Sequence, residues 1–311
     1  MKLIIHAGIH RTGTSSLQDL LASNRKALLQ RGILYPGDTK NHQQLAWAIK
    51  CGEAKSSDVL RLIQKDTDLY KIAILSAEDF CIHKNLSWLK EVSDQVSTSV
   101  HFYLRRQDHW VMSWYNQHIK WPFDKWKSQM SPCEFLECID EFYWIDFHKL
   151  IQRWESILGR DAVHVSVLEK GQVEDVTEDF IRHIDINMGE LPSPAKRANN
   201  SMPVHLLEIT RHLGLHGMSS AQRMRLIGAL RNALPAPPNL PITVYSSDQR
   251  NLILERFATS NRQVALERFQ REDLFFESAP KASDPFFTFP EISRQEYTRQ
   301  WIKPITDQLL L

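Results

Sequence analysis

Short apolar runs alternate along the first half of the chain with longer stretches whose apolar positions recur at helical spacing. The runs typical of buried strands are 2–7, 72–76, 100–104 and 163–168. The stretches with helical spacing are 15–29, 42–51, 86–96, 108–119 and 147–158. Strands that alternate with helices form parallel sheets with helices on both faces, so the pattern predicts an α/β fold.

The remaining segments depart from this alternation. Residues 114–146 are rich in aromatic side chains and predict a helical insertion, a lid over the strand ends, while 203–311 are mostly helical in pattern. We therefore expect one domain, with a nucleotide-binding core in 1–113 and 147–202. The aromatic residues of the insertion are either core packing or a surface on which a sugar or aromatic acceptor stacks.

Composition limits the possible partners. The 311 residues are 42% hydrophobic and 24% charged with a net charge of +1, which is typical of a globular protein and gives no bulk attraction to nucleic acid or membrane. No apolar stretch has the length of a signal peptide or membrane span, so we expect a cytoplasmic protein without a membrane span. Cys133 and Cys138 are expected to be buried thiols, and the four cysteines show no metal-ligand spacing. The sequence does not indicate an oligomeric state.

The loop after the first predicted strand reads "HAGIHRTGTSSLQ". Gly8 and Gly13 have the spacing of the phosphate-binding pattern G-x-x-x-x-G-K-[ST], but Thr14 stands in place of the lysine and Ser15 follows it. Arg11 supplies a cation from another position in the loop. We therefore expect a P-loop-like sheet whose ligand carries an anionic group and does not demand magnesium.

A strand, a glycine loop and a helix start together present backbone N–H groups to an anion, and the helix dipole favours negative charge there. The alternative is an ordinary turn that happens to be rich in small residues. A dinucleotide site is excluded because the loop has no G-x-G-x-x-G pattern.

A second pair of residues follows the third predicted strand. Arg105 stands at the strand end, and Ser113 lies eight residues later in the next predicted helix. An arginine offers fork-shaped, charge-assisted hydrogen bonds and a serine adds a neutral donor, so the pair suits one phosphate group. Taken alone, Arg105 could equally be a surface cation and Ser113 an ordinary helix serine.

Together these motifs resemble those of the sulfotransferases that use 3′-phosphoadenosine 5′-phosphosulfate (PAPS). The family's first loop, usually P-K-x-G-T-T, is similar to residues 10–15 with His10 for proline and Arg11 for lysine, and its second motif is similar to Arg105 and Ser113. The likeness is greatest to bacterial, carbohydrate-type members and extends to "SAEDF", "RANNSMP" and "ERFATSNRQVALERF".

The resemblance implies that a sulfuryl group passes from PAPS to an acceptor hydroxyl by in-line attack, with PAP (the 3′,5′-bisphosphate) as product and no metal. It also implies a carbohydrate or other small hydroxyl compound as acceptor. The residues that it places around PAPS are Arg11, Thr12, Gly13, Thr14, Ser15, Ser16, Arg105, Ser113 and Arg197. Arg11 would also assist the leaving oxygen, as the family lysine does.

The general base is open between three residues. Glu78, at the end of the second strand, is the first candidate, although it also suits the first turn of a helix that Ser76 could cap. His10 and His42 are the others, and each could be structural instead. Two further functions stay open: a nucleotide-dependent kinase or phosphotransferase on the same fold, and a non-catalytic nucleotide-binding module.

Overall fold

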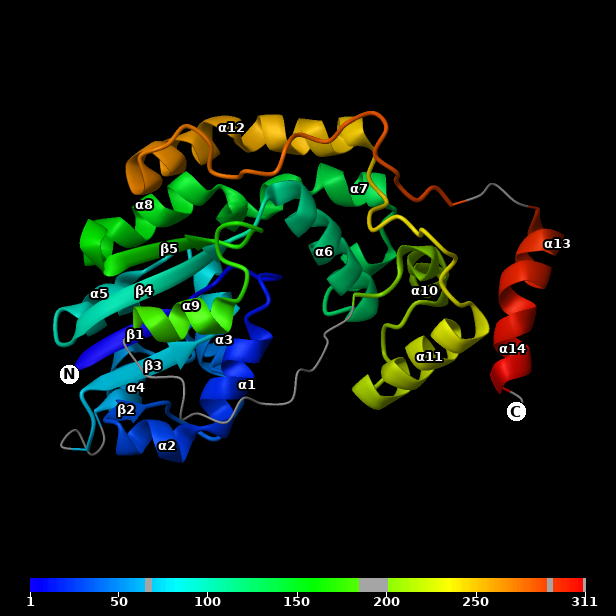
Figure 1. Ribbon diagram of the computed structural model, residues 1–311. Coiled ribbons are helices and arrows are strands. Elements are labelled where there is room, and N and C mark those ends of the chain that lie inside the picture. Colours follow the sequence, from blue (N-terminus) through cyan, green and yellow to red (C-terminus); the bar gives the residue numbers. More distant parts are fainter. Residues whose placement is uncertain (65–68, 185–200, 290–292, 310–311) are drawn as a thin grey trace. The chain divides into compact units, whose positions relative to one another are not determined.

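The central element is a five-stranded, all-parallel sheet with the strand order β2-β3-β1-β4-β5 (Figure 1). Its strands are β1 Lys2–His6, β2 Ile33–Leu34, β3 Ile72–Ser76, β4 Ser97–Leu104 and β5 Val163–Val167. The α/β fold with a P-loop-like parallel sheet is therefore confirmed, and four of the strands lie where the sequence predicted them. β2 was missed because two residues are too short for a periodic pattern.

The computed structural model describes residues 1–64, 69–184, 201–289 and 293–309. Its helices are α1 Ser15–Ser23, α2 Arg25–Gln30, α3 Gln43–Lys50, α4 Ser56–Ile63, α5 Ser87–Ser93, α6 Gln107–Lys120, α7 Pro132–Glu137, α8 Phe147–Leu158, α9 Val176–His183, α10 Leu207–Leu213, α11 Ser220–Ala233, α12 Ser247–Phe269, α13 Arg294–Tyr297 and α14 Lys303–Leu309. Short 3₁₀ segments include η2 Glu78–Ile82 and η5 Tyr143–Ile145. The C-terminal part is thus mostly helical, as predicted.

The single helix predicted over 15–29 is broken in two at Asn24. Its backbone leaves the helical region (φ −106°, ψ 18°), and its side-chain amide donates to the Leu20 carbonyl at 2.9 Å. An asparagine competes with the helix by bonding to nearby backbone groups, which explains the break.

Helices cover both faces of the sheet. On one face Ile4, Ile74 and Tyr103 pack with apolar side chains of α1, α2 and α9 in one buried cluster. On the other face α5 and α8 contact β4, where Phe102 meets Trp154 edge-on with ring centroids 5.4 Å apart. Adjacent strand residues point to opposite faces, so each inner strand contributes to both layers.

The chain divides into two compact units. The first comprises Met1–Arg106, Tyr143–Ala198 and Phe257–Glu277 and contains the sheet. The second comprises Gln107–Phe142, Asn199–Arg256 and Ser278–Leu311. The predicted partition into core, insertion and C-terminal region stays a prediction.

The second unit has an aromatic interior of its own. Trp110 and Trp114 of α6 stack at 5.4 Å, and Tyr115 and Phe135 are fully buried. These rings of the insertion are therefore core, whereas Trp126 is 73% exposed. Cys133 and Cys138 lie here as well, and the expectation that both are buried is wrong: Cys133 is exposed and Cys138 half-buried.

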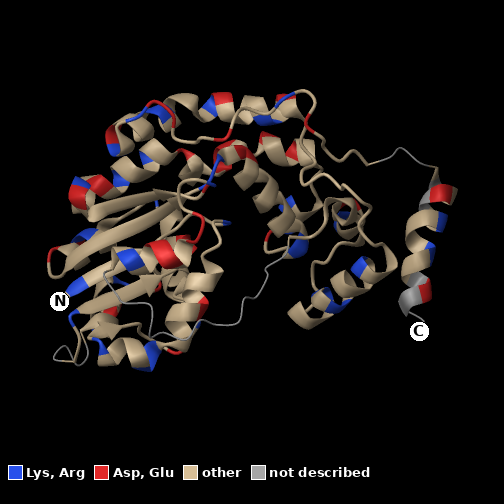
Figure 2. Cartoon of the chain, viewed as in Figure 1, with Lys and Arg blue, Asp and Glu red and all other residues tan. Residues whose placement is uncertain are grey.

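Charges of both signs are interspersed along α12, whereas α11 carries arginines without acidic residues (Figure 2). In the first unit α12 is tied to α8 through Ser260, which accepts from the His148 N–H at 3.0 Å and donates to Asp146 at 2.8 Å.

Phe180→Ala should destabilise the first unit by about 3–5 kcal/mol, because it removes a fully buried ring from the cluster beneath α9 and leaves a cavity. Urea unfolding followed by circular dichroism measures the change. Lys26→Ala on the exposed side of α2 is the control and should shift the unfolding free energy by less than about 0.5 kcal/mol. Equal effects of the two variants would contradict this assignment of the core.

Candidate functional site

Three adjacent strands end together beside the glycine loop. In the sheet register His6 of β1 lies between Ser76 of β3 and His101 of β4. The glycine loop follows β1, η2 follows β3, and Arg105 follows β4. The carboxyl ends of parallel strands are where α/β sheets bind ligands, so the topology alone gathers the predicted motifs of the first unit.

The loop between β1 and α1 depends on its two glycines. A Cβ atom on Gly8 would lie 3.1 Å from His6 Nε2 and 3.2 Å from Thr14 Cγ2, tighter than nearly all such contacts. Gly13 has a φ of +79°, in the left-handed region that glycine enters without strain. The spacing recognised in the sequence therefore reflects one close approach and one left-handed turn.

Arg11 also lies in the left-handed region, with a φ of +71°. A side chain there costs of order 1–3 kcal/mol, which the surroundings must outweigh. Arg105 does so in part: its guanidinium donates to the Arg11 carbonyl at 2.8 Å. Burial lowers the pKa of Arg11, and the charge of Glu78 opposes that shift. The loop thus brings a half-buried cation and a second arginine to one place.

The hydroxyl groups of the loop have different partners. Thr12 is fully buried and donates to the Ile9 carbonyl at 2.7 Å, so its side chain braces the loop. Thr14 is also buried and donates to the Glu78 carboxylate. Ser15 and Ser16 form the first turn of α1, which carries no acidic residue there. The amino end of α1 therefore has no acid of its own, and the carboxylate that meets it is Glu78, which bonds Thr14.

Glu78 is the first residue of η2 and faces the loop. One carboxylate oxygen accepts from the Thr14 hydroxyl and the other from the Gln18 amide at 2.9 Å. Burial alone would raise the pKa of Glu78, but the charge of His10 and the Thr14 hydrogen bond outweigh it and lower the pKa. A carboxylate held ionised in this way is a weak base and a strong anchor for the loop.

His10 has a carboxylate partner of its own. Its Nε2 lies 3.7 Å from Asp79 Oδ1, and its ring meets Trp144 edge-on at 6.3 Å. Asp79 in turn accepts from the Trp47 indole N–H at 2.8 Å, and burial raises the pKa of Asp79. An imidazole oriented by a carboxylate is a common arrangement for proton transfer.

His42, the third candidate base, has structural partners on both ring nitrogens. Nδ1 accepts from the Ser76 N–H at 3.0 Å and Nε2 bonds the Pro36 carbonyl at 3.0 Å. Burial lowers its pKa to about 4. The Ser76 hydroxyl bonds His6 Nδ1 at 2.7 Å and does not cap η2, so the expected cap is wrong, although Glu78 does stand in the first turn of η2.

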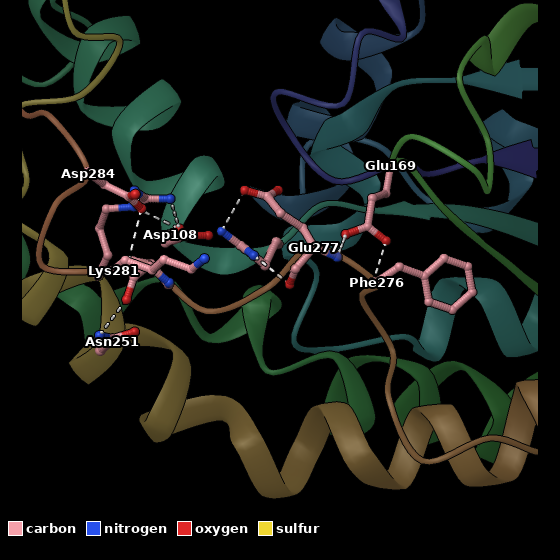
Figure 3. Close-up of polar contacts among 10 residues, drawn as sticks. Asp108, Glu169, Asn251, Phe276, Glu277, Lys281 and Asp284 are labelled. Carbon is pink, nitrogen blue, oxygen red and sulfur yellow. Dashed lines mark hydrogen bonds and ion pairs between the residues drawn. The ribbon is translucent and has the colours of Figure 1, made fainter.

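The two arginines after β4 have different surroundings. Arg106 is buried and pairs with Glu277 at 3.0 Å, while Glu169 accepts the N–H groups of Phe276 and Glu277 (Figure 3). These contacts fasten the segment after α12 to the first unit. Arg105, by contrast, bonds the glycine loop through the Arg11 carbonyl.

The second unit has its own buried pair on α6. Asp108 accepts from Arg250 at 2.8 Å, and Asp284, 3.8 Å from the same guanidinium, also accepts from the Lys281 N–H at 3.0 Å (Figure 3). Ser113 lies five residues, about one and a half turns, further along α6 and is 7% exposed. Its predicted partnership with Arg105 stays a prediction, and Arg197 lies outside the described residues.

Two residues beside the predicted set were missed by sequence reasoning. Asp79 stands next to Glu78 in the same acidic pair, and the sequence offered no reason to prefer one carboxylate. Trp47 is 42% exposed on α3, and an exposed tryptophan in an amphipathic helix is the signal that could have indicated it.

Within the described ranges, no three His, Cys, Asp or Glu side chains are grouped so that they could hold a metal ion. In the same part of the chain no helix combines the length and the apolar character needed to cross a membrane.

No family model matches the chain. It is 24% identical over 208 residues to an uncharacterized protein of Archaeoglobus fulgidus, a match that covers 65% of this chain and 55% of that protein. The chain thus spans about half the length of this curated relative. Among solved structures it is similar to a sulfotransferase from Alicyclobacillus acidocaldarius, with a TM-score of 0.41 and 15% identity over 71% of this chain and 98% of the other.

His42 should make the protein lose stability in acid. Its folded pKa of about 4 lies below the ordinary value of 6.5, so between these values the unfolded state binds the extra proton and stability falls as the pH falls. Removing this group with His42→Gln should reduce the slope of the unfolding free energy by up to about 1.4 kcal/mol per pH unit between pH 6.5 and 4.

Urea unfolding at four pH values measures the slope. His216→Gln replaces an exposed histidine and should leave it unchanged. If His42→Gln unfolds with the same pH dependence as the unaltered chain, His42 is not the buried neutral group described above.

Proposed function

We propose that the protein is a sulfotransferase that uses PAPS. The observation that carries the proposal is the hydrogen bond from Arg105, at the end of β4, to the carbonyl of Arg11 in the glycine loop. It brings a second guanidinium to a loop that already has the half-buried Arg11 cation and the amino end of α1. Two arginines and a helix end on one short loop suit a ligand with several anionic groups.

The residues present fit such a ligand. Arg11 and the backbone N–H groups from Thr12 to Ser16 would hold the 5′-phosphosulfate. Arg105 would hold the 3′-phosphate, for which the sequence motifs also predict Ser113 and Arg197. No metal ligand takes part in this assignment, because the cationic side chains and the helix dipole balance the ligand's charge.

The reaction transfers a sulfuryl group to an acceptor hydroxyl. The acceptor oxygen forms a bond to sulfur, the bond from sulfur to the 5′-phosphate oxygen breaks, and PAP leaves with that oxygen. Arg11 would stabilise the charge that develops on the leaving oxygen. Positioning and charge stabilisation supply most of the acceleration in such transfers.

His10 is the proposed acceptor of the proton, with Asp79 holding the imidazole. Glu78 is the other candidate, but its lowered pKa and its two hydrogen bonds favour a role in anchoring Thr14. The acceptor is a hydroxyl compound, with a carbohydrate or a small molecule as the proposed class.

A nucleotide-dependent phosphotransferase is the second candidate. The contact between Glu78 and Thr14 favours it, since an acidic strand end beside a loop hydroxyl is an arrangement that can hold Mg²⁺ in nucleotide sites. The loop lacks the lysine that such sites place on the β- and γ-phosphates, and Arg11 stands elsewhere. Ligand preference separates the two functions.

Titration calorimetry should show PAP bound at least tenfold more tightly than ADP or ATP with Mg²⁺. Arg105→Ala should weaken PAP binding by about 10- to 100-fold, because a charged hydrogen bond contributes roughly 1.5–3 kcal/mol. Arg31→Ala, an exposed arginine on the chain after α2, is the control and should bind PAP normally. Preference for ATP with Mg²⁺, with PAP ignored, would refute the sulfotransferase proposal.

Arg11 is the sharpest test of catalysis against mere binding. With radiolabelled PAPS and a panel of sugars, Arg11→Lys should retain or raise sulfuryl transfer, whereas Arg11→Ala should abolish it. Both variants should still unfold cooperatively. A protein that binds PAP but transfers no sulfuryl group to any panel member, with or without Arg11, would support the non-catalytic module instead.

A further inference from the structure

The first unit contains a cavity of about 820 Å³ that none of the roles above uses. It lies between the end of α3, the start of α4, and the segment that joins η2 to α5. Its volume falls in the range of small-molecule sites, about 300–1,000 Å³. All its lining residues belong to the first unit, so its shape rests on that unit alone.

The charged residues of the lining are mostly basic. Lys50, Lys55 and Lys84 line the cavity, and among its lining residues Glu91 alone is acidic. The Glu91 carboxylate accepts a hydrogen bond from Ser56, so it is already engaged within the wall. Three ammonium groups around one cavity raise the local concentration of an anion and favour its binding.

Two aromatic side chains form part of the wall. The Tyr143 ring has the Lys84 ammonium 4.4 Å from its centroid, and the Tyr143 hydroxyl donates to the Ile82 carbonyl. Trp88 is fixed by its indole N–H, which donates to His83 Nδ1 at 3.0 Å. Rigid rings beside cations suit a ligand that presents a ring next to an anionic group.

Two segments connect the cavity with the candidate catalytic groups. η2 begins at Glu78 and Asp79 and ends at Ile82 in the cavity wall. At a rise of about 2.0 Å per residue, Glu78 and Ile82 lie about 8 Å apart along the segment. The distance corresponds to roughly one or two sugar rings.

The other segment is η5, where Tyr143 lines the cavity and the next residue, Trp144, meets the His10 ring. A third link passes through α3: the Lys50 ammonium lies 4.1 Å from the centroid of the Trp47 ring, whose indole bonds Asp79. The cavity and the pair of His10 and Asp79 are therefore supported by the same short elements.

We propose that this cavity binds the acceptor at a point remote from the transferred group, and that the acceptor carries a carboxylate or sulfate beside a ring. An acidic sugar is such a molecule. That the bound compound is the acceptor rests on the proposed sulfotransferase function. Binding of an anionic, ring-bearing compound to the cavity does not itself require PAPS.

The test uses 4-nitrophenyl β-D-glucuronide and its uncharged match, 4-nitrophenyl β-D-glucoside. Calorimetry with the full chain should show the glucuronide bound at least tenfold more tightly than the glucoside. The double variant Lys55→Gln with Lys84→Gln should lose about tenfold or more of the glucuronide affinity and leave the glucoside unchanged. Raising the salt concentration should also lower the affinity for the glucuronide.

Lys90→Gln is the matched control. Lys90 is an exposed lysine on α5, pairs with Asp94 at 3.2 Å and does not line the cavity. It should bind the glucuronide as the unaltered chain does. Lys55, Lys84 and Lys90 are all exposed, so the variants should keep the midpoint of urea unfolding. That measurement distinguishes lost binding from lost folding.

Titration with PAP on the same samples separates this inference from the proposed function. If PAP binds while the glucuronide binds no better than the glucoside, the inference is overturned and the sulfotransferase proposal stands. If the glucuronide binds through the lysines and PAP does not bind, the acceptor role is overturned together with the sulfotransferase proposal. Glucuronide binding that ignores the double variant also overturns the assignment to this cavity.

Discussion

The candidate site depends on one half-buried carboxylate placed beside cationic side chains and a helix amino end. Glu78 accepts hydrogen bonds from Thr14 and Gln18, and its charge acts on both Arg11 and His10. Without an anion at the loop, two arginines and a helix amino end would meet with little compensation. The carboxylate supplies that compensation, and it orders the loop in the geometry that a ligand would need.

A second regularity follows from chain geometry at the strand ends. The side chains of adjacent residues point in different directions there, so two similar neighbouring residues have different partners. Arg105 bonds the glycine loop, whereas Arg106 pairs with Glu277. In the same way Glu78 faces Thr14 while Asp79 faces His10 and Trp47. Each pair thus divides two similar groups between different partners.

The sequence sufficed for the parallel sheet, because buried strands and amphipathic helices have distinct periods. It also sufficed for Gly8 and Gly13, whose spacing reflects a steric need. It could not tell Glu78 from Asp79, since the direction of a side chain after a strand is set by a turn that no period encodes. The exposure of Cys133 was missed for a similar reason. The break at Asn24 was missed because the apolar spacing continues past it, while the local bond from its side chain to the Leu20 carbonyl decides the break.

Arg11 shows a conflict between folding and activity. Its backbone lies in the left-handed region, where a glycine is unstrained and an arginine is strained. Selection for a more stable chain would therefore favour a third glycine in this loop, yet that glycine would remove the Arg11 cation. The strained residue of the loop is thus the one that the proposed chemistry most requires. Directed evolution for thermal tolerance would meet this trade-off between stability and activity first at Arg11.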